Sequence, residues 1–134
     1  MDIPLGVLAN DKTRILLVED EPGVRRSLQL LLQANGFDVR AYATGTTLLA
    51  DQSALDATCL VADYRMSDCD GIETLRQLRE KGWSGHALLI TAFPSADLTA
   101  RARQAGFDAV FEKPLRQHIL VRAVERLARP AAEG

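Results

Sequence analysis

Short apolar runs alternate with longer amphipathic segments along most of this chain. Four of the runs are too brief for helices and are bounded by polar residues, which indicates strands buried on both faces of a sheet. They cover residues 14–18, 58–62, 86–91 and 109–111. A fifth run over 37–42 alternates weakly and predicts an edge strand. The pattern therefore predicts five strands.

Apolar residues spaced three and four apart predict five helices, one after each strand. Pro22 favours the first turn of the first helix, and Gly36 marks its end. Asp70 is a candidate N-cap for the third helix. The fourth helix is rich in alanine, so we expect it to be held weakly. The remaining predicted helices cover 45–51, 70–81 and 94–105, and the last carries Ile119, Leu120, Val124 and Leu127.

Five strand–helix alternations predict an α/β sandwich with a parallel sheet and right-handed crossovers. The 134 residues correspond to one domain. We expect this domain to cover 14–128, between a flexible N-terminal arm (1–13) and a C-terminal tail (129–134).

Composition excludes several classes of protein. The net charge of -2 provides no basic patch, which argues against direct binding of nucleic acid. No apolar run approaches the ~20 residues that span a bilayer, so no membrane segment is expected. The first ten residues lack the basic leader of a secretory signal. Two cysteines form no disulfide framework, which suits the reducing cytoplasm.

Chemically active side chains follow the predicted strands. Asp63 ends the central run, Glu19 and Asp20 follow the first, Thr91 ends the fourth, and Lys113 follows the last. Because the carboxyl ends of parallel strands meet at one edge, we expect these five side chains to converge. Each could instead be an ordinary turn or surface residue, but four complementary strand ends make a specific signal.

The three predicted neighbouring carboxylates would repel one another unless a cation lay between them. Mg²⁺ suits such a site because it prefers oxygen ligands and accepts phosphate oxygens. The backbone carbonyl of Arg65 could complete the ligand set. With this metal, the Lys113 ammonium and the Thr91 hydroxyl nearby, one carboxylate could take up a phosphoryl group as an aspartyl phosphate.

The order and spacing of these motifs resemble the receiver domain of two-component response regulators. The resemblance covers about residues 14–128 and implies a flavodoxin-like (βα)5 sandwich with strand order 2-1-3-4-5. It implies that Asp63 is the phosphoacceptor, Glu19 and Asp20 the acidic metal pair, Thr91 the switch hydroxyl and Lys113 the phosphate contact, with Pro114 often following through a cis bond. The matching motifs are LVEDE at 17–21, DYRM at 63–66, DG at 70–71, TA at 91–92 and KP at 113–114.

The resemblance implies a phosphorelay switch and not an enzyme with an external substrate. A histidine kinase or phosphotransfer protein would phosphorylate Asp63 with Mg²⁺. The face made by the fourth helix, fifth strand and fifth helix would then change and bind a downstream protein or a second copy. We further hypothesise that Arg65 and Phe93, each two residues beyond a key site residue, shield the acyl phosphate and make its loss slow.

The chain departs from the family pattern in three places. Ser67 stands where a proline is common, which predicts a looser loop after Asp63. Val110 stands where an aromatic residue usually swings inward, with Phe111 next along, so the usual aromatic coupling is not supported. No helix-turn-helix or catalytic pattern follows Leu127, so we expect no output domain.

Three other functions match parts of this pattern. A haloacid dehalogenase-type phosphatase with an aspartate nucleophile needs a second aspartate two residues further on, where Arg65 stands. A receiver-like interaction module that works without phosphorylation stays open because of Val110. A flavin-binding protein would need a hydroxyl- and glycine-rich first loop, whereas the acidic residues 19–21 would repel a phosphate.

Overall fold

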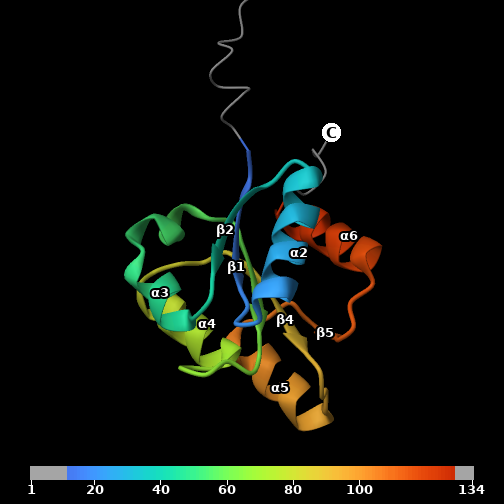
Figure 1. Cartoon of the computed structure of the whole chain (residues 1–134). Coiled ribbons are helices and arrows are strands. Elements are labelled where there is room, and N and C mark those ends of the chain that lie inside the picture. The colour runs from blue at the N-terminus through green and yellow to red at the C-terminus, as the bar shows by residue number, and fades with distance from the viewer. Residues whose placement is uncertain (1–11, 129–134) are drawn as a thin grey trace, which may run out of the picture.

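The structure, a computed structural model, describes residues 12–128 and shows a parallel sheet between two layers of helices (Figure 1). Within these residues five strands follow the order β2-β1-β3-β4-β5, as predicted. The strands are β1 (Arg14–Val18), β2 (Asp38–Tyr42), β3 (Cys59–Asp63), β4 (His86–Thr91) and β5 (Ala109–Glu112). The helices are α2 (Pro22–Ala34), α3 (Gly45–Ala50), η1 (Gln52–Asp56), α4 (Gly71–Glu80), α5 (Ala96–Ala105) and α6 (Gln117–Ala128).

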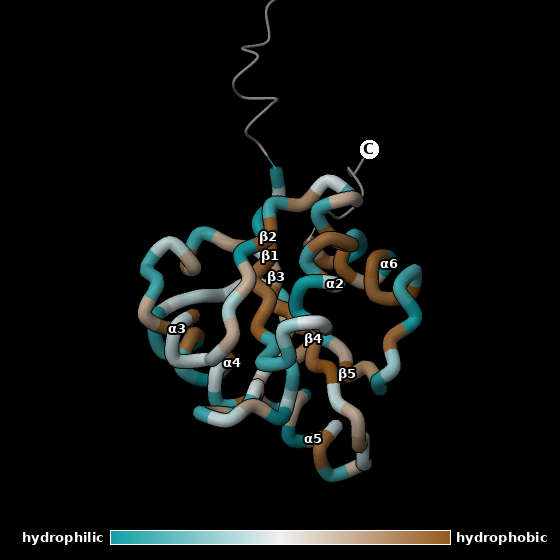
Figure 2. The backbone as a smooth tube through the Cα atoms, in the orientation of Figure 1, coloured by the Kyte–Doolittle hydropathy of each residue, from teal (hydrophilic) through white to brown (hydrophobic). Residues whose placement is uncertain are grey.

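The side chains of the central strands pack alternately into two separate hydrophobic cores, because successive side chains of a strand point to opposite faces of the sheet. In Figure 2 the central strands are coloured mostly as hydrophobic, as are parts of the helices that cover them. One core lies under α3, α4 and α5, and the other under α2 and α6. Leu16, Leu60 and Leu89 belong to the first core, and Ile15, Val61 and Leu88 to the second.

Most predicted elements agree with the structure to within one or two residues, and their ends have clear causes. The carboxylate of Asp70 accepts a hydrogen bond from the Glu73 amide (2.8 Å) at the start of α4. The hydroxyl of Ser95 accepts one from the Leu98 amide (3.0 Å) at the start of α5. Gly106 ends α5 with φ 113°, a backbone conformation that residues other than glycine rarely adopt.

Two details of the helices do not follow from the sequence pattern. The apolar repeat that predicts the last helix does not coincide with its buried face, because Ile119 is 38% exposed whereas Val121 and Ala123 are buried. The short helix η1 was missed. It starts where the Asp51 carboxylate accepts hydrogen bonds from the amide (3.0 Å) and hydroxyl (2.7 Å) of Ser53, and it is too short for a helical repeat to show.

The two predicted terminal segments fall mainly outside the part of the chain that the structure describes. Of the arm at 1–13, residues 1–11 are not described, and none of the tail at 129–134 is. Among residues 12–128, no helix combines the length and apolar character needed to cross a bilayer.

Candidate functional site

The carboxyl ends of four strands meet at one edge of the sheet, and the strand pairing brings the predicted residues there together. Val18 pairs with Ala62, so Glu19 follows β1 at the level where Asp63 ends β3. Thr91 ends β4 beside Glu112, which directly precedes Lys113. The first residue after β1 is fixed further by a hydrogen bond from the Glu19 amide to the Tyr42 carbonyl (3.1 Å).

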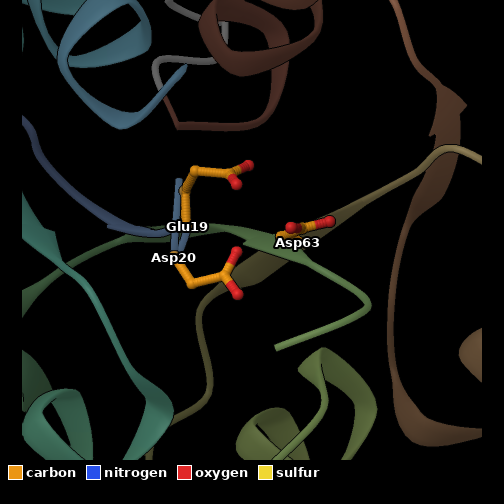
Figure 3. Close-up of side chains that lie close together, drawn as sticks. All are labelled: Glu19, Asp20 and Asp63. Atoms are coloured by element: carbon orange, nitrogen blue, oxygen red, sulfur yellow. The ribbon is translucent and has the colours of Figure 1, made fainter. Parts of the chain in front are cut away.

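Glu19, Asp20 and Asp63 form an acidic cluster at this edge (Figure 3). Each offers one carboxylate oxygen, and these oxygens all lie within 4.8 Å of one another. Glu19 is 1% exposed and Asp63 is 6% exposed, while Asp20 lies nearer the solvent. Negative charge is therefore gathered in a largely buried place, as the sequence predicted.

Among the described residues, Lys113 forms ion pairs with this cluster. Its ammonium donates a hydrogen bond to Glu19 Oε1 (3.2 Å) and lies 3.3 Å from Asp63 Oδ2. Burial lowers the pKa of Lys113, but the neighbouring charges of Glu19 and Asp63 outweigh it, and the pKa is raised. The Lys113–Pro114 bond is cis. Lys113 is therefore charged and bridges the two buried carboxylates.

One ammonium does not balance three carboxylates, and Glu19 shows the consequence. Burial, and then the nearby charge of Asp63, raise the pKa of Glu19 from 4.5 to about 7. Hydrogen bonding from the Glu21 amide (3.2 Å) and the charge of Lys113 oppose this rise without cancelling it. A second cation would relieve the excess charge.

The donor set fits Mg²⁺, because the three clustered side chains offer hard oxygen ligands and one of them faces solvent. A magnesium ion that keeps several waters needs only a few protein ligands, which matches a cluster with an open side. The identity of the metal and the part played by the Arg65 carbonyl stay predictions.

Thr91 lies at the same edge with its hydroxyl directed back to its own loop. It is 2% exposed, and its Oγ1 accepts a hydrogen bond from the Phe93 amide (3.2 Å). Its carbonyl accepts a hydrogen bond from the Lys113 amide (2.8 Å), which links the ends of β4 and β5. The Thr91 hydroxyl thus accepts a hydrogen bond within the loop after β4, and its role as a donor to a phosphoryl group stays a prediction.

The loop between β3 and α4 is held close to the end of β3. The amide of Tyr64 donates to the Ile90 carbonyl (2.8 Å), and the amide of Gly71 donates to the Tyr64 carbonyl (3.0 Å). A Cβ added at Gly71 would lie 2.6 Å from the Asp63 carbonyl oxygen and 2.8 Å from Leu89 Cδ1. Only glycine lets α4 begin this close to the strand that carries Asp63.

Replacing Gly71 with alanine is therefore expected to lower the free energy of unfolding by about 1–3 kcal/mol, the usual cost of overpacking a tight site. Urea unfolding of the purified variant measures it. Gly23→Ala is the matched control, because Gly23 also lies in the first turn of a helix but has open space where a Cβ would go. That control should be neutral or slightly stabilising, and equal losses in both variants would contradict the steric explanation.

The structure also places the residues at which this chain departs from the family pattern. Val110 faces the core under α5, whereas Phe111 faces the opposite core under α6. Because neighbouring residues of a strand point to opposite faces, Phe111 does not replace an aromatic residue at position 110. The guanidinium of Arg65 lies over the Phe93 ring, 5.7 Å from its centroid, so these two predicted shielding residues contact each other.

Two contacts near the site were missing from the sequence interpretation. The Arg101 guanidinium on α5 donates to the Tyr64 hydroxyl (3.3 Å) and lies 5.9 Å from the centroid of its ring. The Asp68 carboxylate accepts hydrogen bonds from amides at the start of α3. Both contacts depend on how a loop lies against a helix, and the pattern of apolar and polar residues gives no signal for that placement.

Comparison with known proteins agrees with this arrangement. The family model described as the response regulator receiver domain matches residues 15–125. The transcriptional regulatory protein FixJ of Rhizobium meliloti is 33% identical over 110 residues, which cover 82% of this chain and 54% of FixJ. The response regulator protein TmoT of Ectopseudomonas mendocina is 28% identical over 116 residues, which cover 86% of this chain and 53% of TmoT.

Solved structures show the same fold. The crystal structure of FixJ-N has a TM-score of 0.78 and 30% identity, with coverage of 92% of this chain and 98% of that one. The BeF3-activated receiver domain of DrrB has a TM-score of 0.79 and 26% identity, with coverage of 87% and 97%.

The chain therefore belongs to the response regulator receiver domain family. Receiver domains are components of two-component systems, in which they interact with histidine kinases and effector domains. This chain spans about half the length of the curated relatives it matches.

Proposed function

We propose that Asp63 accepts a phosphoryl group with the help of Mg²⁺ and that the chain acts as a phosphorylation-controlled switch. One observation carries this proposal: the Lys113 ammonium lies 3.3 Å from Asp63 Oδ2, inside a cluster of three carboxylates that suits a divalent ion. A lone surface aspartate would have neither partner. The family membership supports the same function.

In the proposed reaction, a carboxylate oxygen of Asp63 attacks the phosphorus of a phosphohistidine on the donor protein. A phosphorus–oxygen bond forms while the phosphorus–nitrogen bond breaks, and the imidazole leaves with the electron pair of that bond and is protonated from solvent. Lys113 and the Thr91 hydroxyl provide donors for the oxygens of the transferring group. A bound Mg²⁺, held by Glu19, Asp20, Asp63 and the Arg65 carbonyl, would neutralise charge on those oxygens.

The donor would be a histidine kinase or phosphotransfer protein that covers the site edge. Beside Lys113 lies a groove of about 490 Å³ between the start of α2 and the loop after β5, and Val24, Pro114 and Leu115 are among its lining residues. Its apolar lining next to the acceptor offers the donor a surface on which to dock.

The output surface in this proposal is the face made by α5, β5 and α6. Helix α5 is suited to move, because its buried residues are Leu98 and Ala102, one of which is small. Thr91 joins this region to the site, since it ends β4 and its carbonyl holds the Lys113 amide. A shift of the Thr91 hydroxyl towards the phosphoryl group would therefore change the segment leading into α5, and a downstream protein or a second copy would bind the altered face.

Intact mass spectrometry tests the proposal. The full chain with Mg²⁺ and acetyl phosphate should gain the mass of one phosphoryl group, and Asp63→Asn should gain none. Beryllofluoride, which binds where a phosphoryl group would, should produce a dimer or another change on size exclusion in the parent alone. No gain of mass in the parent, or an equal gain in the variant, would refute phosphorylation at Asp63. The chain would then be better explained as an interaction module that works without phosphorylation.

Shielding by Arg65 and Phe93 makes a separate prediction about the lifetime of the phosphoryl group. Arg65→Asn and Phe93→Ala should each lose phosphate about two- to fivefold faster than the parent, as expected for an exposed cation–π contact of ~0.5–1 kcal/mol. Mass spectra recorded over time after removal of acetyl phosphate measure the rate. Arg26→Asn, on the exposed side of α2, is the control.

The double variant at Arg65 and Phe93 separates shielding from unrelated effects. If the two side chains act through their mutual contact, the double variant should lose phosphate no faster than either single variant. Unchanged rates in both single variants would show that neither residue protects the acyl phosphate.

In this proposal the chain signals by binding other proteins. It catalyses its own phosphorylation, loses the phosphoryl group slowly and turns over no external substrate. We place it in the cytoplasm, which suits two cysteines that both lack a disulfide in the described residues. Turnover of small phosphate esters would instead favour the phosphatase reading, for which Arg65 replaces the required second aspartate.

A further inference from the structure

The loop that connects Asp63 to α4 is attached to a second helix, α3, through Asp68. Asp68 Oδ2 accepts a hydrogen bond from the Thr46 amide (2.7 Å), and Oδ1 accepts a longer one from the Gly45 amide (3.4 Å). Gly45 and Thr46 are the first two residues of α3. Their amides have no partner within the helix, so an acidic side chain from another segment can satisfy them.

Helix α3 does not depend on Asp68 for its own N-cap. The Thr44 hydroxyl accepts the hydrogen bond from the Thr47 amide (3.1 Å), as an N-cap residue does. Asp68 therefore accepts hydrogen bonds from the Gly45 and Thr46 amides, which the Thr44 cap does not bind. The effect of this contact falls on the loop that carries Asp68, and its loss should leave α3 formed.

Close packing beside the Asp68 contact shows that the loop and α3 are fitted to each other. A Cβ added at Gly45 would lie 2.5 Å from Thr74 Oγ1 and 2.7 Å from Cys69 Sγ. Cys69 Sγ and Thr74 Oγ1 are themselves 3.3 Å apart. Glycine at the first position of α3 thus lets the loop lie directly against the helix.

The charge of Asp68 is stabilised in this position. Some burial acts to raise its pKa, but hydrogen bonds from Thr46 outweigh this and the pKa is lowered to about 2. Asp68 is consequently ionised at neutral pH, where the attraction to the helix amides is strongest.

We propose that Asp68 is a positioning residue that fixes the 64–70 loop against the start of α3 and so holds the Arg65 carbonyl ready for Mg²⁺. This rests on the proposed function, since it assumes that Mg²⁺ binds beside Asp63. The loop lacks proline at position 67, and the Asp68 contact restrains the backbone in its place. Without it, part of the binding free energy of Mg²⁺ goes into ordering the loop.

Isothermal titration of the full chain with Mg²⁺ tests this. Asp68→Ala should raise the Mg²⁺ dissociation constant about tenfold, the lower end of the effect of removing an outer-shell partner. Asp56→Ala is the charge-matched control, because Asp56 is exposed and precedes the opposite end of β3. It should leave the constant unchanged. An unchanged constant in Asp68→Ala would overturn the proposal.

A third variant separates the hydrogen bond from the charge of Asp68. Thr46→Pro removes the amide that Asp68 binds, leaves the charge in place and lies in the first turn of α3, where proline is tolerated. It should weaken Mg²⁺ binding as Asp68→Ala does, and the double variant should be no weaker than either single one. Parental Mg²⁺ binding in Thr46→Pro would mean that Asp68 acts through its charge alone, and additive losses would mean that the two residues act independently; either result would overturn positioning by the hydrogen bond.

Amide hydrogen exchange without metal tests the same contact independently of Mg²⁺. The Thr46 amide and the 64–70 loop should exchange faster in Asp68→Ala than in Asp56→Ala, while the Thr47 amide stays protected by Thr44. If the parent binds no Mg²⁺, the proposed metal site fails, and the exchange data still show whether Asp68 restrains the loop. If the parent binds Mg²⁺ and the exchange rates are equal, only the positioning role fails.

Discussion

Lys113→Met is expected to slow phosphorylation of Asp63 by acetyl phosphate about a hundredfold. This is the usual effect of removing one hydrogen-bond donor that stabilises negative charge in a transition state. The same variant should bind Mg²⁺ more tightly than the parent. The reason is that the Lys113 ammonium lies 3.2 Å from Glu19 Oε1 and 3.3 Å from Asp63 Oδ2, where it competes with a metal for the same carboxylates. Rates come from intact mass at saturating Mg²⁺, and affinities from calorimetry.

These two expected changes have opposite signs, which separates a direct role of Lys113 from general damage. A misfolded variant would lose both phosphorylation and metal binding. Lys81→Met is the control, since Lys81 is exposed at the end of α4 and should leave both quantities unchanged. Phosphorylation at the parental rate in Lys113→Met would show that the ammonium does not assist the transfer.

The site could be predicted because each of its residues ends or closely follows a predicted strand. An apolar run such as 14–18 is recognisable by itself, and parallel pairing then carries Glu19 to the edge where Asp63 and Lys113 also lie. The prediction needed only the order of strands and not the details of any side chain. This explains why contacts between residues as far apart as Glu19 and Lys113 were anticipated from local patterns.

The contacts that were missed depend on how loops and helices sit beside one another. Asp68 meets the start of α3 because the 64–70 loop lies against that helix, and no periodicity in the sequence encodes this placement. The pair of Tyr64 and Arg101 likewise depends on the position of α5. The repeat that includes Ile119 does not match the buried face of α6, because spacings of three and four residues are compatible with neighbouring faces of a helix and only packing decides between them.

The Tyr64–Arg101 contact bears on how a signal could reach α5 in a chain with valine at position 110. Tyr64 follows the proposed phosphoacceptor directly, and Arg101 lies near the middle of α5. Arg65 and Phe93 form a second connection, between the loop after β3 and the loop before α5. The segments on either side of the site are thus joined by side chains other than the usual aromatic residue, which is compatible with a switch that does not use it.

The burial of Glu19 leads to the second large effect, a dependence of stability on pH in the absence of metal. The pKa of Glu19 is raised from 4.5 to about 7 by burial and by Asp63. The folded protein therefore holds this proton more tightly than the unfolded chain does. Between pH 4.5 and pH 7 the folded state binds more protons, so its stability falls as the pH rises.

Urea unfolding in EDTA at pH 5 and pH 8 measures this effect, with Glu19→Gln as the comparison. Between pH 5 and pH 8, the free energy of unfolding of the parent should fall by on the order of 2–3 kcal/mol more than that of Glu19→Gln, because glutamine does not ionise. Glu80→Gln, on the exposed surface of α4, should keep the parental dependence. Saturating Mg²⁺ should restore the parent at pH 8, since the metal binds the ionised carboxylate and offsets the cost of burying it. If the free energy of unfolding changed equally with pH in the parent and in Glu19→Gln, the excess negative charge would be relieved in some other way. The electrostatic argument for a cation at this edge would then fail.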